Sequence, residues 1–271
     1  MNSCMVCPRN CKVDRTKKYG YCKAPNDAVV HGIMAHRGEE PVISGSRGSG
    51  TVFFMGCNLG CVFCQNYDIS QSCNGPLVTA AGLAEMFMNL KKRGVHNINL
   101  VSPSHFVPPI AEAIRLAKEK GVNIPFIYNS NAYDALPSLK MLDGLVDIYM
   151  PDLKYTDDAL GLLYSDVPNY FTVAREALME MHRQVGDPVI KGGIMQKGVL
   201  IRHLAMPGLH EDSIRVLDWI KTNLSSALVN LMDQYRPAYR AAEYNEIDRR
   251  LTGSEYRPLV SYFSKIGLRQ H

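Results

Sequence analysis

The sequence predicts an α/β fold built on a parallel sheet. Short apolar runs, which are typical of buried strands, alternate along most of the chain with longer segments whose apolar residues recur at helical spacing. Glycine and proline stand at the junctions between these segments, where they end helices and begin loops. Repeated strand–helix units form parallel sheets with right-handed crossovers. Because the chain supplies six such units rather than eight, we expect a partial (β/α)6 TIM-like barrel, preceded by a small cysteine-rich extension.

Each strand is expected where apolar and β-branched residues follow one another. The predicted strands are Thr51–Met55, Asn97–Val101, Ile124–Tyr128, Val146–Met150, Val199–Met206 and Leu228–Met232. The segments between them show the apolar spacing of helices. The predicted helices are Thr79–Arg93, Pro108–Lys120, Ala135–Met141, a helix that begins near Thr156, Phe171–Val185, Asp212–Asn223 and Tyr256–Ile266.

The chain is expected to divide into two parts, a cysteine-rich metal-binding extension over residues 1–47 and the barrel over residues 48–271. Residues 28–50 are typical of one or two strands followed by a loop. Four residues in this stretch are either metal ligands or polar contacts of the loop: His31, His36, Glu39 and Glu40.

Composition and charge exclude several classes of protein. The 271 residues carry a formal net charge of +4 without a long basic block, so nucleic-acid binding is not indicated. The first residues lack the apolar segment of a signal peptide, and the uncharged residues 48–67 are too polar to span a membrane. Eight cysteines without an export signal are typical of reduced, metal-binding thiols. We therefore expect a cytoplasmic protein without membrane contact.

Cys57, Cys61 and Cys64 follow the first predicted strand at the spacing C-x3-C-x2-C. They stand in a loop at the carboxyl end of that strand, where ligands bind in parallel α/β folds. Three thiolates are one fewer than the four that usually hold an iron–sulfur cluster, so one iron would stay open to an outside ligand. The alternatives are a zinc ion with an open coordination position and a loop of three structural thiols.

This motif, with Phe63 just before its last cysteine, resembles that of the radical S-adenosylmethionine (SAM) superfamily. The flanking residues Ser46–Thr51 and Cys64–Tyr67 are similar to the pyruvate formate-lyase activating enzyme-like branch, in particular to uncharacterised members with an N-terminal four-cysteine motif. The resemblance implies that the three cysteines hold a [4Fe-4S] cluster whose fourth iron is chelated by SAM. It also implies that Phe63 lies against the adenine.

Further cofactor-binding residues follow from the same resemblance. Ser104 and His105 stand where the activating enzymes have a Gly-Gly-Glu motif that contacts the SAM amino group, although neither residue carries the charge of a carboxylate. Ser130 and Asp152 match positions that bind a monovalent cation beside SAM. Lys154 lies two residues after Asp152 on an extended segment and points the same way, toward an anionic group. The alternatives are a polar residue at a helix start for His105 and a surface ion pair for Asp152 with Lys154.

Arg202 lies inside an otherwise apolar predicted strand, where a buried charge needs a partner. The planar guanidinium suits a bidentate contact with a carboxylate. The resemblance implies that this carboxylate belongs to SAM. The alternative is a buried ion pair within the protein.

Cys4, Cys7, Cys11 and Cys22 open the chain within a short stretch that also contains Pro8 and Gly20. This spacing is typical of a metal site, and it fits either a zinc ion or a second iron–sulfur cluster. The alternative is a segment of free or disulfide-bonded thiols. The related group shares the motif, but the resemblance assigns it no role.

The predicted activity is reductive cleavage of SAM to a 5′-deoxyadenosyl radical that abstracts hydrogen from a substrate. No acid–base or Ser/His/Asp arrangement competes with this reading, and no catalytic side chain is assigned. The resemblance implies a flavodoxin or ferredoxin as electron donor and a glycyl radical enzyme as protein substrate. The alternatives are modification of another protein, an RNA or a small molecule, and a non-enzymatic iron–sulfur electron-transfer protein.

Overall fold

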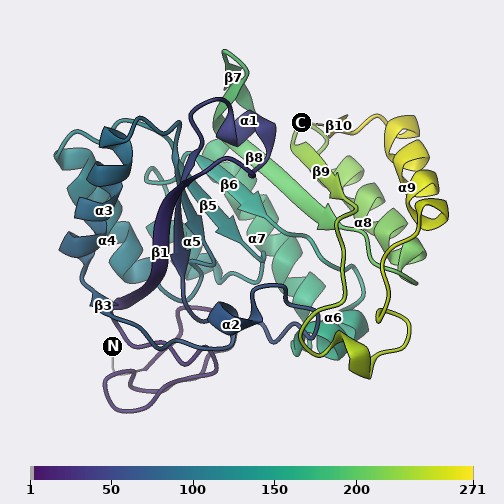
Figure 1. Cartoon of the computed structure of the whole chain (residues 1–271), viewed down its shortest axis with the longest axis horizontal. Coiled ribbons are helices and arrows are strands. Elements are labelled where there is room, and N and C mark those ends of the chain that lie inside the picture. The colour runs from purple at the N-terminus through teal and green to yellow at the C-terminus, as the bar shows by residue number, and fades with distance from the viewer. Residues whose placement is uncertain (1–2, 271) are drawn as a thin grey trace.

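A computed structural model describes residues 3–270 of the chain (Figure 1). Its strands are β1 (Ala28–His36), β2 (Ser49–Phe54), β3 (Leu77–Val78), β4 (Ile98–Val101), β5 (Phe126–Ser130), β6 (Ile148–Pro151), β7 (Val189–Lys191), β8 (Ile194–Leu204), β9 (Leu228–Met232) and β10 (Arg269–Gln270). Its helices are α1 (Pro41–Ser44), α2 (Tyr67–Ser70), α3 (Ala80–Lys92), α4 (Val107–Glu119), α5 (Leu136–Met141), α6 (Asp158–Ser165), α7 (Tyr170–Val185), α8 (His210–Asn223), the 3-10 helix η1 (Ala241–Glu243) and α9 (Gly253–Lys265).

All strands belong to one sheet in the order β10-β9-β8-β6-β5-β4-β2-β1-β3, with β7 paired to β8. The neighbours β2, β4, β5, β6, β8 and β9 run parallel to one another. Each of these strands lies beside the next parallel strand along the chain, and helices connect most of them. The predicted α/β fold with an open, partial barrel is thus confirmed.

The predicted bounds of the parallel strands and their helices agree with the structure to within a few residues, except at β8. The sequence places the start of this strand at Val199, whereas it begins at Ile194. Its first residues pair with β7 in a hairpin whose turn is Gly192–Gly193, both with positive φ. Glycines suit such a turn because they adopt left-handed conformations without steric cost.

The boundary expected between residues 47 and 48 does not coincide with an edge of the sheet. β1 pairs antiparallel with β2, with His36 opposite Ser49, and the start of β1 pairs with β3. Residues 28–36 therefore belong to the same sheet as the barrel strands. Residues 3–27, by contrast, contain neither helix nor strand.

The short helix α1 packs against the inner face of the barrel sheet (Figure 1). Val42 and Ile43 form a separate apolar cluster with side chains from β5, β6, β8 and β9, namely Ile127, Ile148, Met150, Met195, Leu200 and Leu228. A buried asparagine fixes this segment, because Asn97 Nδ2 donates to the Ile43 carbonyl at 2.9 Å. Asn97 Oδ1 also accepts from Ser49 Oγ at 2.5 Å. The segment before β2 is therefore part of the barrel interior.

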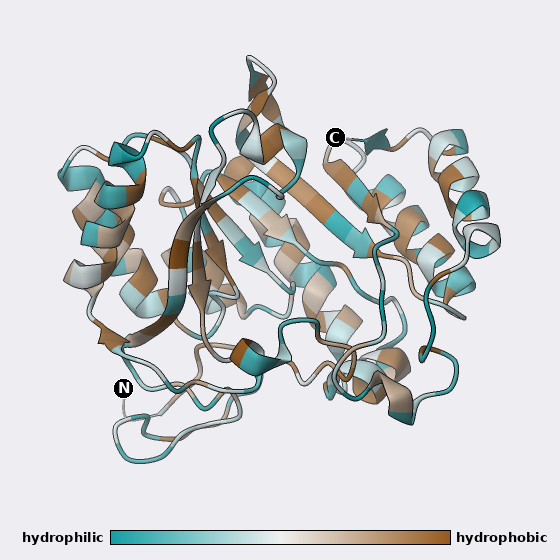
Figure 2. Cartoon of the chain, in the orientation of Figure 1, coloured by the Kyte–Doolittle hydropathy of each residue, from teal (hydrophilic) through white to brown (hydrophobic). Residues whose placement is uncertain are grey.

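The main core lies between the opposite face of the sheet and the longer helices. Phe126 and Tyr128 face this core, whereas Ile127 between them faces α1, as the alternation of a strand requires. Figure 2 shows hydrophobic residues concentrated along the strands, with hydrophilic residues on the outer parts of the helices. Within residues 3–270, no helix is long and apolar enough to cross a membrane.

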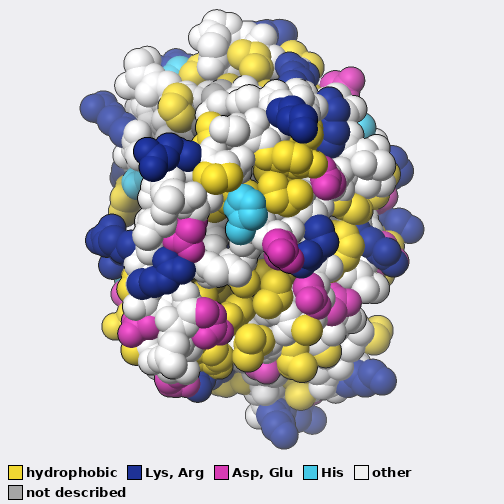
Figure 3. Space-filling view, turned by 90° about the vertical axis from the view of Figure 1, so that its right-hand side faces the viewer, with side chains coloured by type: hydrophobic (Ala, Val, Ile, Leu, Met, Phe, Trp, Pro, Cys, Tyr) yellow, Lys and Arg dark blue, Asp and Glu magenta, His cyan; other side chains and the backbone are white. Residues whose placement is uncertain are grey.

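The face of the molecule drawn in Figure 3 carries charges of both signs. Lys and Arg side chains are scattered over it among Asp, Glu and apolar side chains. This mixture agrees with the small net charge of +4 and leaves no uniformly basic surface on the face shown.

Replacing Ile43 by alanine is expected to lower the free energy of unfolding by about 2–5 kcal/mol, because the fully buried side chain would leave a cavity inside the barrel. The measurement is urea denaturation followed by circular dichroism. Leu162→Ala is the matched control, since Leu162 is 56% exposed and its loss is expected to cost less than about 0.5 kcal/mol. Equal stability of the two variants would contradict the assignment of α1 to the barrel core.

Candidate functional site

A cavity of about 480 Å³ lies at the carboxyl ends of the parallel strands. The strand ends and the loops after them supply its polar lining, with Ser102, Asn129, Ser130, Asn131, Asp152, Lys154 and Arg202. Its apolar lining includes Phe53, Phe54, Leu59, Phe63, Leu204 and Met232. The three cysteines of the C-x3-C-x2-C motif line the same cavity, so the structure brings the predicted thiols and most of the predicted polar groups together.

The cysteine loop leaves β2 through Gly56, whose φ of +81° belongs to the left-handed region that favours glycine. The loop is held by its neighbours: Gly60 N–H donates to the Ser165 carbonyl and Val62 N–H donates to the Tyr164 carbonyl. On the other side, Asn58 Nδ2 donates to the Tyr133 carbonyl at 2.6 Å. The loop is thus fixed on α6 and on the loop after β5.

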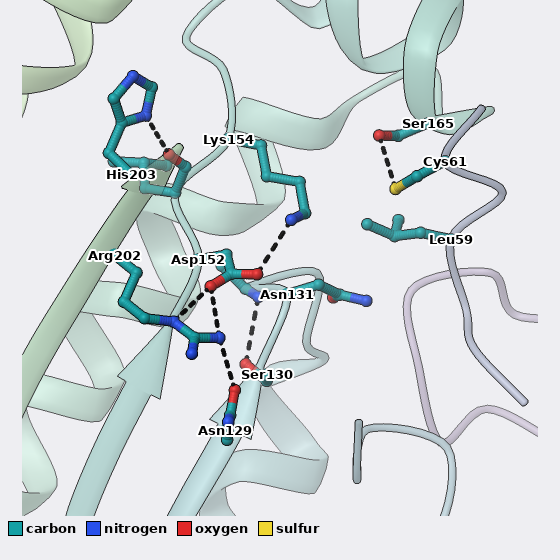
Figure 4. Close-up of polar contacts among 12 residues, drawn as sticks. Leu59, Cys61, Asn129, Ser130, Asn131, Asp152, Lys154, Ser165, Arg202 and His203 are labelled. Carbon is teal, nitrogen blue, oxygen red and sulfur yellow. Dashed lines mark hydrogen bonds and ion pairs between the residues drawn. The ribbon is translucent and has the colours of Figure 1, made fainter. Parts of the chain in front are cut away.

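Each thiol of the motif has a polar neighbour at its sulfur. The Leu59 N–H donates to Cys57 Sγ at 3.4 Å. Ser165 Oγ lies 3.1 Å from Cys61 Sγ, as Figure 4 shows, and Ser70 Oγ lies 3.2 Å from Cys64 Sγ. Asn131 Nδ2 also donates to Cys57 Sγ, at 3.5 Å. Donors around sulfur favour the thiolate form that metals require.

The thiols themselves are unlike reactive free cysteines. Burial, together with the neighbouring Cys61, raises the pKa of Cys57 to about 12, and burial also raises the pKa of Cys61. The thiols of Cys57 and Cys61 are therefore neutral near pH 7 as long as no metal is bound. The side chains as positioned in residues 3–270 form no group of three or more His, Cys, Asp or Glu that could hold a metal ion. A [4Fe-4S] cluster, by contrast, is bound by cysteines that each ligate a different iron, and the three hydrogen-bonded thiols of one cavity fit that donor set.

Arg202 on β8 is the centre of a charged network in the cavity (Figure 4). Its Nε donates to Asp152 Oδ1 at 2.8 Å, and its Nη2 donates to Asn129 Oδ1 at 2.8 Å. Lys154 Nζ lies 3.0 Å from the other carboxylate oxygen of Asp152. Asp152 and Arg202 meet because β6 and β8 are neighbours and their ends form a parallel bridge.

The network decides the charge states of its members. Burial alone would raise the pKa of Asp152, but Arg202 and Lys154 outweigh burial and lower it. The pKa of Lys154 is raised, because Asp152 outweighs the burial that would lower it. All three groups are therefore charged at neutral pH. Arg202 makes an ion pair with Asp152, which is the alternative to a ligand contact that the sequence left open. It also lines the cavity, as a contact with a ligand would require.

Ser130 lies at the end of β5 and is held by a carboxylate that sequence reasoning missed. Its Oγ donates to Asp134 Oδ2 at 2.7 Å, and Tyr128 Oη donates to Asp134 Oδ1 at 2.8 Å. Burial raises the pKa of Asp134, and the hydroxyl donors counteract this rise. Because the Ser130 hydroxyl donates its hydrogen bond to Asp134, its oxygen is free to accept a hydrogen bond from a ligand in the cavity.

Ser104 and His105 do not line the cavity. Both are buried, and His105 Nε2 bonds to the Met55 carbonyl at 2.7 Å. Burial lowers the pKa of His105 to about 4, so its ring is neutral at pH 7. At this strand end, Val101 and Ser102 reach the cavity, and the φ of +57° at Ser102 turns the chain there. Contact of Ser104 or His105 with SAM stays a prediction of the resemblance.

Phe63 within the cysteine motif and three residues ahead of the motif also belong to the site. Phe63 lines it and packs on Tyr235 with a ring-centre distance of 6.0 Å. His36 and Glu39 line it as well, with His36 Nδ1 3.3 Å from Glu39 Oε1. Glu40 Oε1 lies 3.7 Å from Arg202 Nη1. The structure thus brings His36, Glu39 and Glu40 to the site as polar contacts. In the sequence, their closeness to one another was the one feature that indicated a shared role.

The family model of the radical SAM superfamily matches residues 51–220, which include the cysteine motif and the strand ends up to Arg202. This match covers more than half of the chain. The chain belongs to the radical SAM superfamily. Membership implies a [4Fe-4S] cluster and SAM as the cofactors of the cavity. The finer likeness to the pyruvate formate-lyase activating enzyme-like branch stays a prediction.

A curated relative of this radical SAM protein is the uncharacterised protein MJ0674 from Methanocaldococcus jannaschii. The two are 33% identical over 274 residues, which cover 98% of this chain and 75% of the relative. The likeness therefore extends over nearly the whole chain, beyond the residues that the family model matches.

Solved structures with the same fold include SuiB from Streptococcus suis bound to S-adenosylmethionine, with a TM-score of 0.56 and 16% identity. The match covers 80% of this chain and 48% of SuiB. Methylornithine synthase matches with a TM-score of 0.54 and 17% identity, over 77% of this chain and 59% of the synthase. The chain thus spans about half the length of these enzymes, and at such identities they show the fold alone.

Asp152→Asn is expected to lower the free energy of unfolding by about 1–3 kcal/mol at pH 7, because Arg202 and Lys154 lose their shared carboxylate. The lowered pKa of Asp152 stabilises the fold above the unfolded value near pH 4, and this contribution is lost as the pH falls through the folded value. The difference between wild type and variant should therefore shrink below about pH 4.

The measurement is urea denaturation of both proteins across this pH range, under reducing conditions without oxygen. Asp233→Asn is the control, because Asp233 is exposed. A difference between wild type and Asp152→Asn that stays constant with pH would show that the carboxylate is not held ionised by its neighbours.

Proposed function

We propose that this chain cleaves SAM reductively and uses the resulting 5′-deoxyadenosyl radical to abstract a hydrogen atom from a substrate. The observation that carries the proposal is the convergence of the three motif thiols with Arg202, Asp152 and Lys154 on one cavity. When bound, the cluster would supply the electron that breaks the bond between C5′ and sulfur, which leaves methionine. An iron–sulfur electron carrier has no need of charged groups at the barrel mouth.

The residues of the cavity suit the two parts of SAM. The guanidinium of Arg202 and the ammonium of Lys154 are the cations that can bind the SAM carboxylate. Asp152 holds both cations between β6 and β8, so it positions them before ligand binding. Phe54 and Phe63 supply apolar walls against which the adenosyl group can pack and from which water is excluded.

For the substrate, we propose a glycine of a partner protein, as in the activating enzymes that the sequence resembles, with a flavodoxin or ferredoxin as electron donor. The support is the resemblance of the residues around the cysteine motif. The test is anaerobic incubation with SAM, reductant and a glycyl radical protein encoded nearby, followed by electron paramagnetic resonance. A glycyl signal supports this substrate. Formation of 5′-deoxyadenosine without such a signal would leave the SAM chemistry standing and reject this substrate.

Cys61→Ala is expected to abolish cleavage of SAM, because it removes one thiol of the cavity. The variant should keep the circular dichroism spectrum of the wild type, since Cys61 lies in a loop rather than in a strand. The measurement is formation of 5′-deoxyadenosine by protein reconstituted with iron and sulfide without oxygen. Cys73→Ala, which alters a cysteine outside the motif, is the control. A Cys61→Ala variant that forms 5′-deoxyadenosine at the wild-type rate would refute the cluster assignment.

Arg202→Lys is expected to weaken SAM binding about tenfold or more, because a lysine keeps the charge but cannot make the paired contacts of a guanidinium. The measurement is the equilibrium dissociation constant for SAM on reconstituted protein, from calorimetry without oxygen. Arg183→Lys is the matched control, since Arg183 makes its ion pairs with Asp143 and Glu180 on the outer surface. Unchanged SAM affinity in Arg202→Lys would restrict Arg202 to the ion pair with Asp152.

A further inference from the structure

The N-terminal residues 3–27 lie at the lower end of the sheet in Figure 1, beside α2 and the cysteine loop of the cavity. They form neither helix nor strand, and yet Cys4 and Cys7 within them are buried. Cys4, Val6 and Ala24 join the main core, but no helix or strand holds the rest of the segment in one conformation. A bound metal is a common means of fixing such a segment.

This segment packs directly on the loop that carries the cluster cysteines. Arg9, which lies between Cys7 and Cys11, donates from Nε to the Asn58 carbonyl at 2.8 Å. The Cys22 carbonyl lies against Gly56, where an added Cβ would come within 2.7 Å of that oxygen. The segment that carries the N-terminal cysteines is thus in direct contact with the cluster loop.

The N-terminal thiols have the backbone environment of metal ligands. The amides of Arg9 and Ala24 follow Cys7 and Cys22 by two residues, as the Leu59 amide follows Cys57, whose sulfur it contacts at 3.4 Å. The Tyr21 N–H lies 3.5 Å from Cys11 Sγ. An amide donor at sulfur stabilises a thiolate more than a neutral thiol, and the thiolate is the form that binds a metal.

The same thiols are close to one another. Backbone hydrogen bonds from Cys4 N–H to the Val13 carbonyl and from Lys12 N–H to the Cys4 carbonyl, both 2.9 Å, fold the segment back on itself. A further backbone hydrogen bond, from Asn10 N–H to the Cys7 carbonyl at 3.1 Å, turns the chain between Cys7 and Cys11, and the contact of Cys11 Sγ with Tyr21 N brings Cys11 beside Cys22. The side chains of residues 3–27 as positioned do not form a group that could hold a metal ion. Rotation about the Cα–Cβ bond of each cysteine changes the position of its sulfur without moving the backbone.

We propose that Cys4, Cys7, Cys11 and Cys22 bind a thiophilic metal centre, either a zinc ion or an iron–sulfur cluster, that fixes residues 3–27 against the cluster loop. On binding, each thiol gives up its proton to solvent and its sulfur bonds to the metal. The metal centre then acts as a brace: it holds Arg9 on Asn58 and the Cys22 carbonyl on Gly56, so the loop that bears Cys57 and Cys61 keeps its shape.

The test uses the full chain with Cys57, Cys61 and Cys64 all replaced by alanine, so that any tightly bound metal belongs to the N-terminal cysteines. The protein is expressed with both zinc and iron, purified without oxygen and analysed for zinc, iron and acid-labile sulfide. About one zinc ion, or several irons with matching sulfide, per chain is expected. Zinc identifies a structural ion and iron with sulfide a cluster, and both support the site.

The ligands are tested by adding Cys7→Ser and Cys22→Ser to the same background, which should remove the metal. Cys73→Ser in that background is the matched control and should retain it, because the Cys73 thiol donates to the Met55 carbonyl. If the triple-alanine protein holds no more metal than the variant that also lacks Cys7 and Cys22, the proposal is overturned. The result does not depend on SAM cleavage, so it is separate from the proposed activity.

A separate experiment tests whether the N-terminal metal centre holds the cluster loop in its conformation. In a protein with intact Cys57, Cys61 and Cys64, Cys7→Ser with Cys22→Ser should speed proteolysis of the cluster loop and lower the iron retained there, whereas Cys73→Ser should change neither. Metal in the N-terminal site without any effect of its loss on the loop would refute the brace.

Discussion

The site depends on one cation, Arg202, whose side chain is only 16% exposed. Arg202 joins β8 to Asp152 after β6, to Asn129 at the end of β5 and to Glu40 in the loop before α1, so four separate segments are positioned by one guanidinium. A charge at that depth is tolerated only while its partners are present, and each partner is itself held by the order of the strands. The cavity is therefore a product of the parallel sheet and of the segment that precedes it in the chain.

The N-terminal part of the chain completes the barrel on two sides. The segment of β1 and α1 fills the inner face and brings Glu39 and Glu40 toward Arg202, while residues 3–27 cover the cysteine loop from outside. The loop that bears Cys57, Cys61 and Cys64 is consequently enclosed between the extension, α6 and the loop after β5. Its shape depends on residues that are far from it in sequence.

The sequence predicted the parallel strands and long helices well, because each is a periodic pattern that the residues of one element carry alone. It also placed Arg202, Asp152, Lys154 and Ser130 at strand ends, since the order of parallel units fixes where those ends meet. It missed the packing of α1 in the barrel, which depends on contacts between distant segments, and the hydrogen bond from Ser130 to Asp134, which depends on how the loop after β5 turns back. Ser104 and His105 were displaced from the cavity by the turn at Ser102, whose positive φ no pattern of residues announces.

The sheet ends at both sides in strands of only two residues, β3 and β10. A strand of this length exposes almost no free backbone ladder, so β3 and β10 themselves offer little for an added strand from another polypeptide to pair with. Strands this short also lower the risk of edge-to-edge aggregation of the sheet.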